Sequence, residues 1–366
     1  MYYVEVDGGL NFLSVCVSRS LCVRCDSVVD SLPPLSTYQN RKAEPMHITH
    51  IGINGDGGRL DGSPARLAED LAFFQQSGYS CVELSSSGLD VILNGRVFPS
   101  QLDRVRAVTE RFPLTYTLHP PNRLNLAHGS DLALDKANFA ANLEVCAALG
   151  AKVMVYHSGL IALERVRLGL VDLPTADELA AAAAQEVDAL KELMPYAAEL
   201  GVTVAMENRD PHSWEVGLLR QLGRDPSELA TFYGGLLIPR IVEQVEAVDH
   251  PALGICLDLA HLFLATNQLR IDYLEAVGQA APHLRHIHAN DNFGRLDDAY
   301  DGLGDRNPYG EGDLHLPPGW GAIPLADALR QLPDYTGVLI LELRPRYRDR
   351  LVEALATMRG IVASVS

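Results

Sequence analysis

No stretch of the 366-residue sequence is long and apolar enough to span a membrane, which takes about 18 uninterrupted apolar residues. Basic residues are also in short supply, because 30 Lys and Arg face 47 Asp and Glu and leave a formal net charge of −17. A protein that neutralises nucleic-acid phosphates needs a positive surface, so this balance disfavours a nucleic-acid partner. The composition therefore indicates a globular protein without a membrane span.

Cysteine is scarce as well, with six residues in the whole chain. Cys22 and Cys25 form a lone Cys-x-x-Cys, and without a second pair this spacing is a weak signal for zinc or redox chemistry. Cys81, Cys146 and Cys256 fall in predicted strands or helices, where small buried thiols are expected. The beginning of the chain also lacks the positive charge of a secretion signal, so we expect a cytoplasmic protein.

Residues 1–45 show no sustained strand or helix period and end in the polar stretch 36–44. Met46 stands directly before the first convincing strand and is an alternative start to Met1. We interpret residues 1–45 as a poorly ordered N-terminal extension and residues 46–366 as a single domain.

After residue 46, short apolar runs alternate with longer helical stretches, which is typical of βα units and a parallel sheet. The helical stretches include 64–77, 132–149 and 176–200. The predicted strands are Thr49–Ile53, Ser80–Leu84, Leu114–Leu118, Lys152–Tyr156, Thr203–Met206, Leu253–Leu257, Leu284–Ile287 and Val338–Leu341. Eight such strands favour a closed (β/α)8 TIM barrel over an open sheet, and no Gly-x-Gly-x-x-Gly follows the first strand to suggest a dinucleotide fold.

Metal-binding residue types recur at the ends of these strands and in the long connection 289–324. A barrel brings its strand ends onto one ring, so these side chains can share a site although they are far apart in sequence. Carboxylates and imidazoles suit Zn, Mn, Fe or Co, and the lack of thiolates argues against a closed structural zinc. The candidate ligands are His119, His157, Glu207, Asp258, His261, His288, Asp313, His315 and Glu342.

Each of these residues also has a simpler interpretation. A single His after a strand is more often a hydrogen-bonded loop residue than a ligand, and Asp258 could cap the helix that follows it. The repetition across strands favours the metal site over these alternatives. We interpret other histidines, including His212, His283 and His286, as surface or packing residues.

The segments that carry this pattern resemble the xylose-isomerase-like TIM-barrel superfamily. They are THIGIN, YTLHPPNRLNL, VMVYHSG, VAMENRD, ICLDLAHLF, HIHANDN, DLHLPPGWGAI and LILELRP, and the resemblance extends from Ile48 to about Arg346. The superfamily contains sugar-phosphate isomerases and epimerases together with endonuclease-IV-type abasic-site nucleases. The resemblance therefore implies a TIM barrel and one of these two chemistries.

In the isomerase and epimerase branch, the resemblance implies one metal ion held by Glu207, Asp258, His288 and Glu342. Glu207 and Glu342 would then move protons on either side of a metal-polarised carbonyl. In the nuclease branch three zinc ions need a larger ligand set, and the nine candidate residues match all of it. The resemblance is therefore compatible with one to three ions of Zn, Mn, Co or Fe.

The sequence departs from the nucleases where they carry an aromatic–aliphatic wedge for DNA, because Asn122 and Arg123 stand there. Arg123, Arg209 and Arg344 could hold a carboxylate or phosphate on a small substrate, and Trp320 could form a pocket wall. We therefore expect a divalent-metal-dependent isomerase or epimerase of a small sugar or sugar phosphate.

A multinuclear metal hydrolase or lyase, such as an abasic-site phosphodiesterase, is the second interpretation, and a non-catalytic binding protein is the third. Neither a membrane nor nucleic acid is expected as a partner, and the sequence leaves a homodimer open.

Overall fold

The computed structural model describes residues 46–127, 131–157, 159, 163–296 and 306–365. The predictions for residues 1–45, including those for Cys22 and Cys25, lie outside the described residues. The single domain predicted from Met46 onward stays a prediction.

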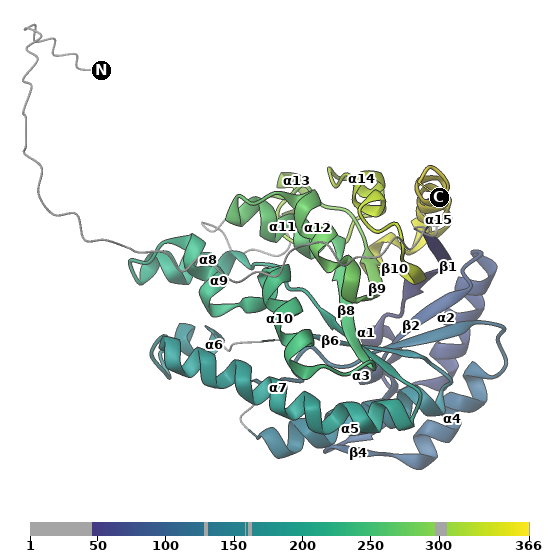
Figure 1. The fold of residues 1–366 in the computed structure, drawn as a ribbon. Helices are drawn as coiled ribbons and strands as arrows, with labels where there is room; N and C mark the ends of the chain where they lie inside the picture. Colours follow the sequence, from purple (N-terminus) through teal and green to yellow (C-terminus); the bar gives the residue numbers. More distant parts are fainter. Residues whose placement is uncertain (1–45, 128–130, 158, 160–162, 297–305, 366) are drawn as a thin grey trace, which may run out of the picture. The chain divides into compact units, whose positions relative to one another are not determined.

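Eight parallel strands close into one barrel, which confirms the predicted TIM-barrel fold (Figure 1). Around the barrel the neighbours follow the order β1-β10-β9-β8-β7-β6-β5-β2, so each strand pairs with the strands next to it in the βα succession. The strands are β1 His47–Asn54, β2 Cys81–Ser85, β5 Thr115–His119, β6 Val153–His157, β7 Thr203–Glu207, β8 Leu253–Asp258, β9 Leu284–Ala289 and β10 Thr336–Leu341.

All eight predicted strands are present, but several continue further than the apolar pattern indicated. His119, His157, Glu207 and Asp258 are the last residues of their strands rather than the first residues after them. The cause is backbone pairing, which ignores side-chain polarity: His157 pairs with Glu207 across β6 and β7, and Asp258 pairs with His288 across β8 and β9. The candidate ligands are therefore held on the sheet itself.

Helices surround the strands, and a two-stranded antiparallel hairpin follows α3 (Figure 1). The longest helix, α7, begins at a capping box in which Thr175 and Glu178 bond each other's backbone amides, and its alanines favour the helical state. No helix of the described residues is long and apolar enough to cross a membrane. The hairpin strands are β3 Ile92–Leu93 and β4 Arg96–Val97. The helices are α1 Gly57–Leu60, α2 Pro64–Gln76, α3 Ser86–Leu89, α4 Pro99–Thr109, α5 Leu132–Ala148, α6 Leu163–Arg167, α7 Ala176–Glu199, α8 Ser213–Gln221, α9 Leu229–Phe232, α10 Ile238–Val248, α11 Leu259–Leu269, α12 Tyr273–Ala280, α13 Arg306–Tyr309, α14 Leu325–Arg330 and α15 Leu351–Ala363.

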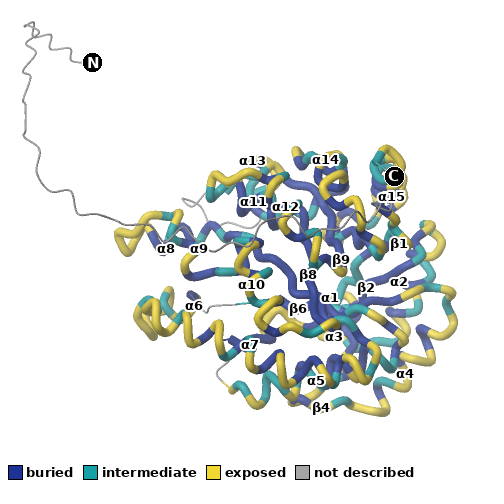
Figure 2. The backbone as a smooth tube through the Cα atoms, viewed as in Figure 1, coloured by how far each residue is buried: buried dark blue, intermediate teal, exposed yellow. Residues whose placement is uncertain are grey.

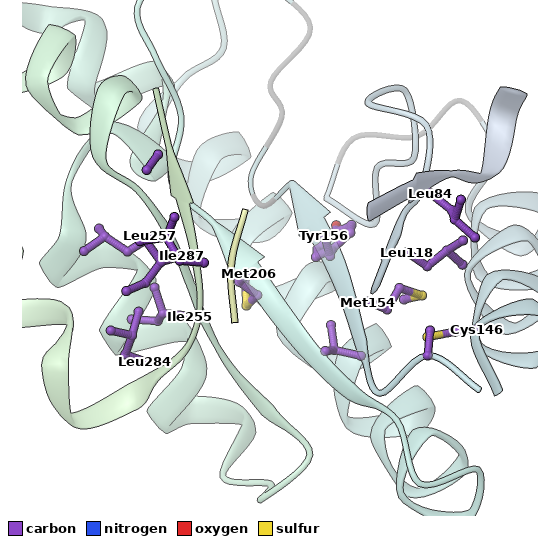
Figure 3. Close-up of a cluster of buried hydrophobic side chains, with 14 of the residues drawn as sticks. Leu84, Leu118, Cys146, Met154, Tyr156, Met206, Ile255, Leu257, Leu284 and Ile287 are labelled. Atoms are coloured by element: carbon purple, nitrogen blue, oxygen red, sulfur yellow. The ribbon is translucent and has the colours of Figure 1, made fainter. Parts of the chain in front are cut away.

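Side chains along each strand alternate between those that pack against the helices and those that point into the barrel. Leu118, Met154, Met206 and Ile287 belong to the main hydrophobic core between the strands and the helices, and Figure 3 shows them spread over neighbouring strands. Figure 2 shows most strands buried, whereas the outer helices carry buried and exposed residues in alternation. The residues next to the core residues along each strand point into the barrel, and this inner set includes five of the candidate ligands: His119, His157, Glu207, Asp258 and His288.

Candidate metal centre

All nine predicted metal-ligating residues come together at the carboxyl ends of the barrel strands. Six of them line a cavity of about 400 Å³, while Glu207, Asp258 and His288 are buried beside it with no exposed surface. The six lining residues are His119, His157, His261, Asp313, His315 and Glu342. The nine residues form three groups, two of which share Glu207, and each group brings at least three potential ligand atoms within 4.8 Å of one another.

The first group consists of Glu207, Asp258, His288 and Glu342. His288 Nδ1 lies 2.9 Å from Glu207 Oε1, 3.9 Å from Asp258 Oδ2 and 3.8 Å from Glu342 Oε2. Glu207 Oε2 and Asp258 Oδ2 are buried and have no hydrogen-bond partner. Buried carboxylate oxygens without a partner are costly, and a divalent cation would satisfy both of them. The residues present therefore fit a metal ion.

Asp258 serves the fold and the centre with different oxygens. Its Oδ1 accepts hydrogen bonds from the backbone amides of Ala260 and His261, both 2.7 Å away, and so caps α11. Asn208 fixes the Asp258 backbone through one hydrogen bond to each of its amide and carbonyl groups. The cap leaves Asp258 Oδ2 directed at the first group.

The second group is His261, Asp313 and His315. The Nδ1 of His261 donates to the Asn208 carbonyl over 3.0 Å, and the Nδ1 of His315 donates to the Glu342 carbonyl over 2.9 Å. These bonds place one hydrogen on each Nδ1 and direct each Nε2 at Asp313, so either Nε2 can bind a cation there once it carries no hydrogen of its own. His315 has a φ of +47°, an unusual conformation for a non-glycine residue that is often found at functional sites.

The third group is His119, His157 and Glu207, and its two histidines differ in tautomer. His119 Nδ1 donates to the Pro120 carbonyl over 2.7 Å, which leaves a lone pair on Nε2. His157 Nδ1 instead contacts NH1 of Arg209, and because a guanidinium can only donate, that nitrogen must accept. The neutral His157 ring therefore carries its hydrogen on Nε2, which lies 2.5 Å from Glu207 Oε2. The His157 hydrogen thus faces Glu207 Oε2 without hydrogen-bond geometry, and in this tautomer Nε2 has no lone pair for a cation.

Burial and charge act in opposite directions on the carboxylates of the centre. Burial would raise the pKa of Glu207, but His157 and His288 hold the pKa well below its usual value. Burial raises the pKa of Asp258 to about 7, with only partial opposition from His261. Burial also lowers the pKa of His157 to about 4, so this ring is neutral near neutral pH. The centre thus combines ionised and protonated acids, a combination common at functional sites.

Glu83 is a further buried carboxylate of the centre that the strand-end pattern did not predict. Its Oε1 lies 2.9 Å from His288 Nε2, and its Oε2 lies 3.0 Å from His286 Nε2 and accepts a 2.9 Å hydrogen bond from the hydroxyl of Thr117. Because His288 Nδ1 faces the first group, Glu83 supports the ring from behind, an arrangement typical of metal-binding histidines. Of the two interpretations given for His286, a surface residue or a packing residue, its full burial excludes the surface one, and its ring is bonded to Glu83.

Two of the four residues predicted to bind substrate line the cavity, and two do not. Arg209 and Arg344 line the cavity, together with Arg306, which was not predicted. Arg123 and Trp320 are not among the residues that line it. Trp320 is 40% exposed and donates from its indole nitrogen to Glu353.

His212, interpreted from sequence as a surface or packing residue, also lines the cavity. Asp210 raises the pKa of His212 to about 9 against the effect of burial. This histidine is therefore charged at neutral pH beside the centre.

Comparison with known proteins shows the family to which the chain belongs. The family model for the xylose isomerase-like TIM barrel matches residues 71–361. No curated protein matches the sequence.

Among solved structures, a D-tagatose 3-epimerase-like protein is 19% identical with a TM-score of 0.61, over 86% of this chain and 98% of that one. A D-psicose 3-epimerase solved in the presence of D-fructose is 17% identical with a TM-score of 0.58, over 86% and 99% of the two chains. A 3-keto-D-glucoside 4-epimerase from E. coli is 15% identical with a TM-score of 0.56, over 85% and 99%. At these identities the likeness shows a shared fold.

Proposed function

Because the chain belongs to the xylose isomerase-like TIM-barrel family, we propose that it is a divalent-metal-dependent isomerase or epimerase of a small sugar or sugar derivative. One observation carries the proposal: two glutamates reach the same buried imidazole, with His288 Nδ1 2.9 Å from Glu207 and 3.8 Å from Glu342. Two carboxylates at one centre can take a proton from a carbon atom and return it. The names of the structurally similar epimerases agree with this chemistry.

In this proposal Glu207, Asp258, His288 and Glu342 hold the cation, which supplies the Lewis acidity that polarises the sugar carbonyl. Glu342 is 14% exposed and its carboxylate makes no hydrogen bond within the described part of the chain, so it is free to meet substrate in the cavity. It takes the proton from the carbon beside the carbonyl, and the electron pair moves toward the carbonyl oxygen. This gives an enediolate. For epimerisation Glu207, which is ionised at rest, takes a proton from the neighbouring substrate hydroxyl and passes it to the opposite face of the carbon, and Glu342 then returns its own proton to that hydroxyl oxygen.

The test is proton exchange, because both epimerisation and isomerisation require a carbon–hydrogen bond to break. We expect metal-loaded protein to place deuterium from D2O into D-tagatose, D-psicose or a related ketose. Glu342→Gln should lower that rate by about 10²–10⁴-fold when variant and wild type are compared at equal bound metal, which is measured because Glu342 is also a proposed ligand. Glu246→Gln is the matched control, since Glu246 is 62% exposed and pairs only with His283 among the described residues. Full exchange in Glu342→Gln would contradict the assigned role.

A multinuclear phosphodiesterase is the second candidate, and the His261–Asp313–His315 group favours it because it offers ligands for a second cation. The tautomer of His157 and the net charge of −17 weigh against the three-metal, DNA-binding form of that chemistry. Metal content separates the candidates: about one Mn or Co per chain supports the isomerase or epimerase, and two or three Zn or Fe support the hydrolase. The cytoplasmic location and the homodimer stay predictions.

A further inference from the structure

Arg209 is a buried cation in the wall of the candidate site. It follows Glu207 by two residues, is only 7% exposed, and is held by a 2.8 Å hydrogen bond from its backbone amide to the Gly235 carbonyl. Its NH1 donates to His157, which is an uncharged acceptor, and its Nε has no hydrogen-bond partner. Within the described residues, no Asp or Glu forms an ion pair with this guanidinium.

Burying the Arg209 guanidinium in this way is unfavourable unless a negatively charged group compensates its charge. A buried charge without a counter-charge loses its hydration and gains little in return. Arginine cannot escape this cost by losing its proton, because its guanidinium stays charged in proteins. Arg209 is therefore better explained by a negatively charged group that enters from outside the chain.

The cavity offers the place for that group. Arg209 and Arg306 both line this cavity. Arg306 comes from α13, and its NH2 donates a 2.8 Å hydrogen bond to the hydroxyl of Ser213, which lies in the connection that follows β7, as Arg209 does. Arg344 lines the cavity too, but it is engaged by Asp313, with NH2 3.0 Å from the carbonyl and 3.8 Å from Oδ2. The cavity thus has arginines in its wall in addition to the carboxylates of the metal centre.

We propose that the sugar acted on here carries an oxyanion, either a carboxylate or a phosphate, which Arg209 and Arg306 bind while the metal centre acts on the carbonyl end. The proposal rests on the proposed isomerase or epimerase function. Guanidinium groups bind carboxylates and phosphates alike, through paired hydrogen bonds to two negatively charged oxygens. Both oxyanions share this feature. The structurally similar proteins are named for D-tagatose and D-psicose, which carry no such charge.

The first experiment compares matched substrates on the metal-loaded protein. D-Tagatose, D-tagatose 6-phosphate and the keto-acid D-tagaturonate test the uncharged, phosphorylated and carboxylated forms by deuterium exchange. We expect one charged form to exceed the uncharged sugar in kcat/KM by about tenfold or more, since hydrogen bonds to charged groups have that strength. Arg209→Gln should remove this preference, so that the ratio of kcat/KM for the charged form to kcat/KM for D-tagatose falls to about one.

The result that overturns the proposal is equal use of all three sugars by the wild type, or an Arg209→Gln variant that loses charged and uncharged substrates alike. Arg240→Gln is the matched control, because Arg240 is 63% exposed and pairs with Glu243 away from the cavity. Metal content is measured in each variant, so that a loss of the cation is recognised separately.

A second measurement keeps the proposal testable if no sugar reacts and the proposed function fails. Inorganic phosphate and malonate are titrated into metal-loaded wild type, Arg209→Gln and Arg240→Gln by calorimetry. We expect at least one of the two anions to bind about tenfold or more weakly to Arg209→Gln than to both other proteins. Equal binding of both anions by all three proteins would show that Arg209 does not receive an anion.

Discussion

Replacing Glu83 by Gln tests whether the carboxylate behind His288 tunes the metal centre. Gln has nearly the same shape, and its oxygen can take the place of Glu83 Oε1, 2.9 Å from His288 Nε2, while its NH2 group faces His286. The substitution removes the negative charge and also replaces Oε2, which accepts from Thr117 and bonds His286, by an NH2 group. It therefore tests whether the charge beside His288 strengthens the binding of a cation, and Thr117→Val, which keeps the charge, separates out the contribution of the Thr117 hydrogen bond.

The expected magnitude follows from the position of Glu83 directly behind a candidate ligand. Changes to groups that hydrogen-bond a metal-binding histidine typically weaken metal binding by about tenfold to a hundredfold, or about 1.4–2.7 kcal/mol. We expect Glu83→Gln to lie near the lower end of this range, because one acceptor remains. Thr117→Val should have a smaller effect, since it removes one hydrogen bond to Glu83 and keeps the charge.

The assay is competition for Mn or Co between the protein and a chelator of known affinity, with thermal unfolding of the metal-free proteins as a check on the fold. Asp70→Asn is the matched control, because Asp70 is also a buried carboxylate but pairs with Arg59 and Arg348 outside the centre. It should change stability and leave metal affinity as it is. Unchanged metal affinity in Glu83→Gln would refute the role assigned to Glu83.

Three further outcomes follow from the same geometry. Metal affinity should fall as the pH decreases through about 7, because burial raises the pKa of Asp258 to about 7 and a cation must displace its proton below that pH; titrations on both sides of pH 7 check this, and a pH-independent affinity would contradict it. Removing the metal with a chelator should lower the free energy of unfolding by about 2.7 kcal/mol, compared with protein in a free metal concentration of about 100 times the Kd for that metal. Denaturant unfolding with and without metal measures this difference. Thr175→Ala should cost about 1 kcal/mol of stability without changing metal affinity, because it removes the cap of α7; an undiminished midpoint in denaturant would show that the cap contributes nothing.

The barrel and the candidate ligands could be predicted because both depend on short-range patterns. Apolar runs mark the strands, and a closed parallel barrel puts all their carboxyl ends on one ring. His119, His157 and Glu207 stand where those runs stop, so the end of the pattern also marked the site. The strands nevertheless continue through these residues, because the backbone ladder forms regardless of side-chain polarity.

The supporting residues could not be found from strand ends alone. Glu83 and His286 lie inside their strands, on the inward face, and the signal that could have revealed them is a charged or polar residue within an apolar strand such as CVELS. Arg306 was missed for a different reason. It reaches Ser213 from 93 residues further along the chain, through a long connection whose path no local pattern encodes.

The hydrogen bonds around the ligands say more about chemistry than the ligand set itself. The nine residues that match a three-metal nuclease are all present, yet their histidines differ in the partner of Nδ1. His119, His261 and His315 each give their Nδ1 hydrogen to a backbone carbonyl and keep Nε2 for a cation. His157 accepts from Arg209 instead and turns a hydrogen toward Glu207. Because the same arginine lines the cavity, a single side chain both weakens the third group as a cation site and places positive charge next to the substrate. That combination favours one cation acting on a small negatively charged sugar over three cations acting on a nucleic-acid backbone.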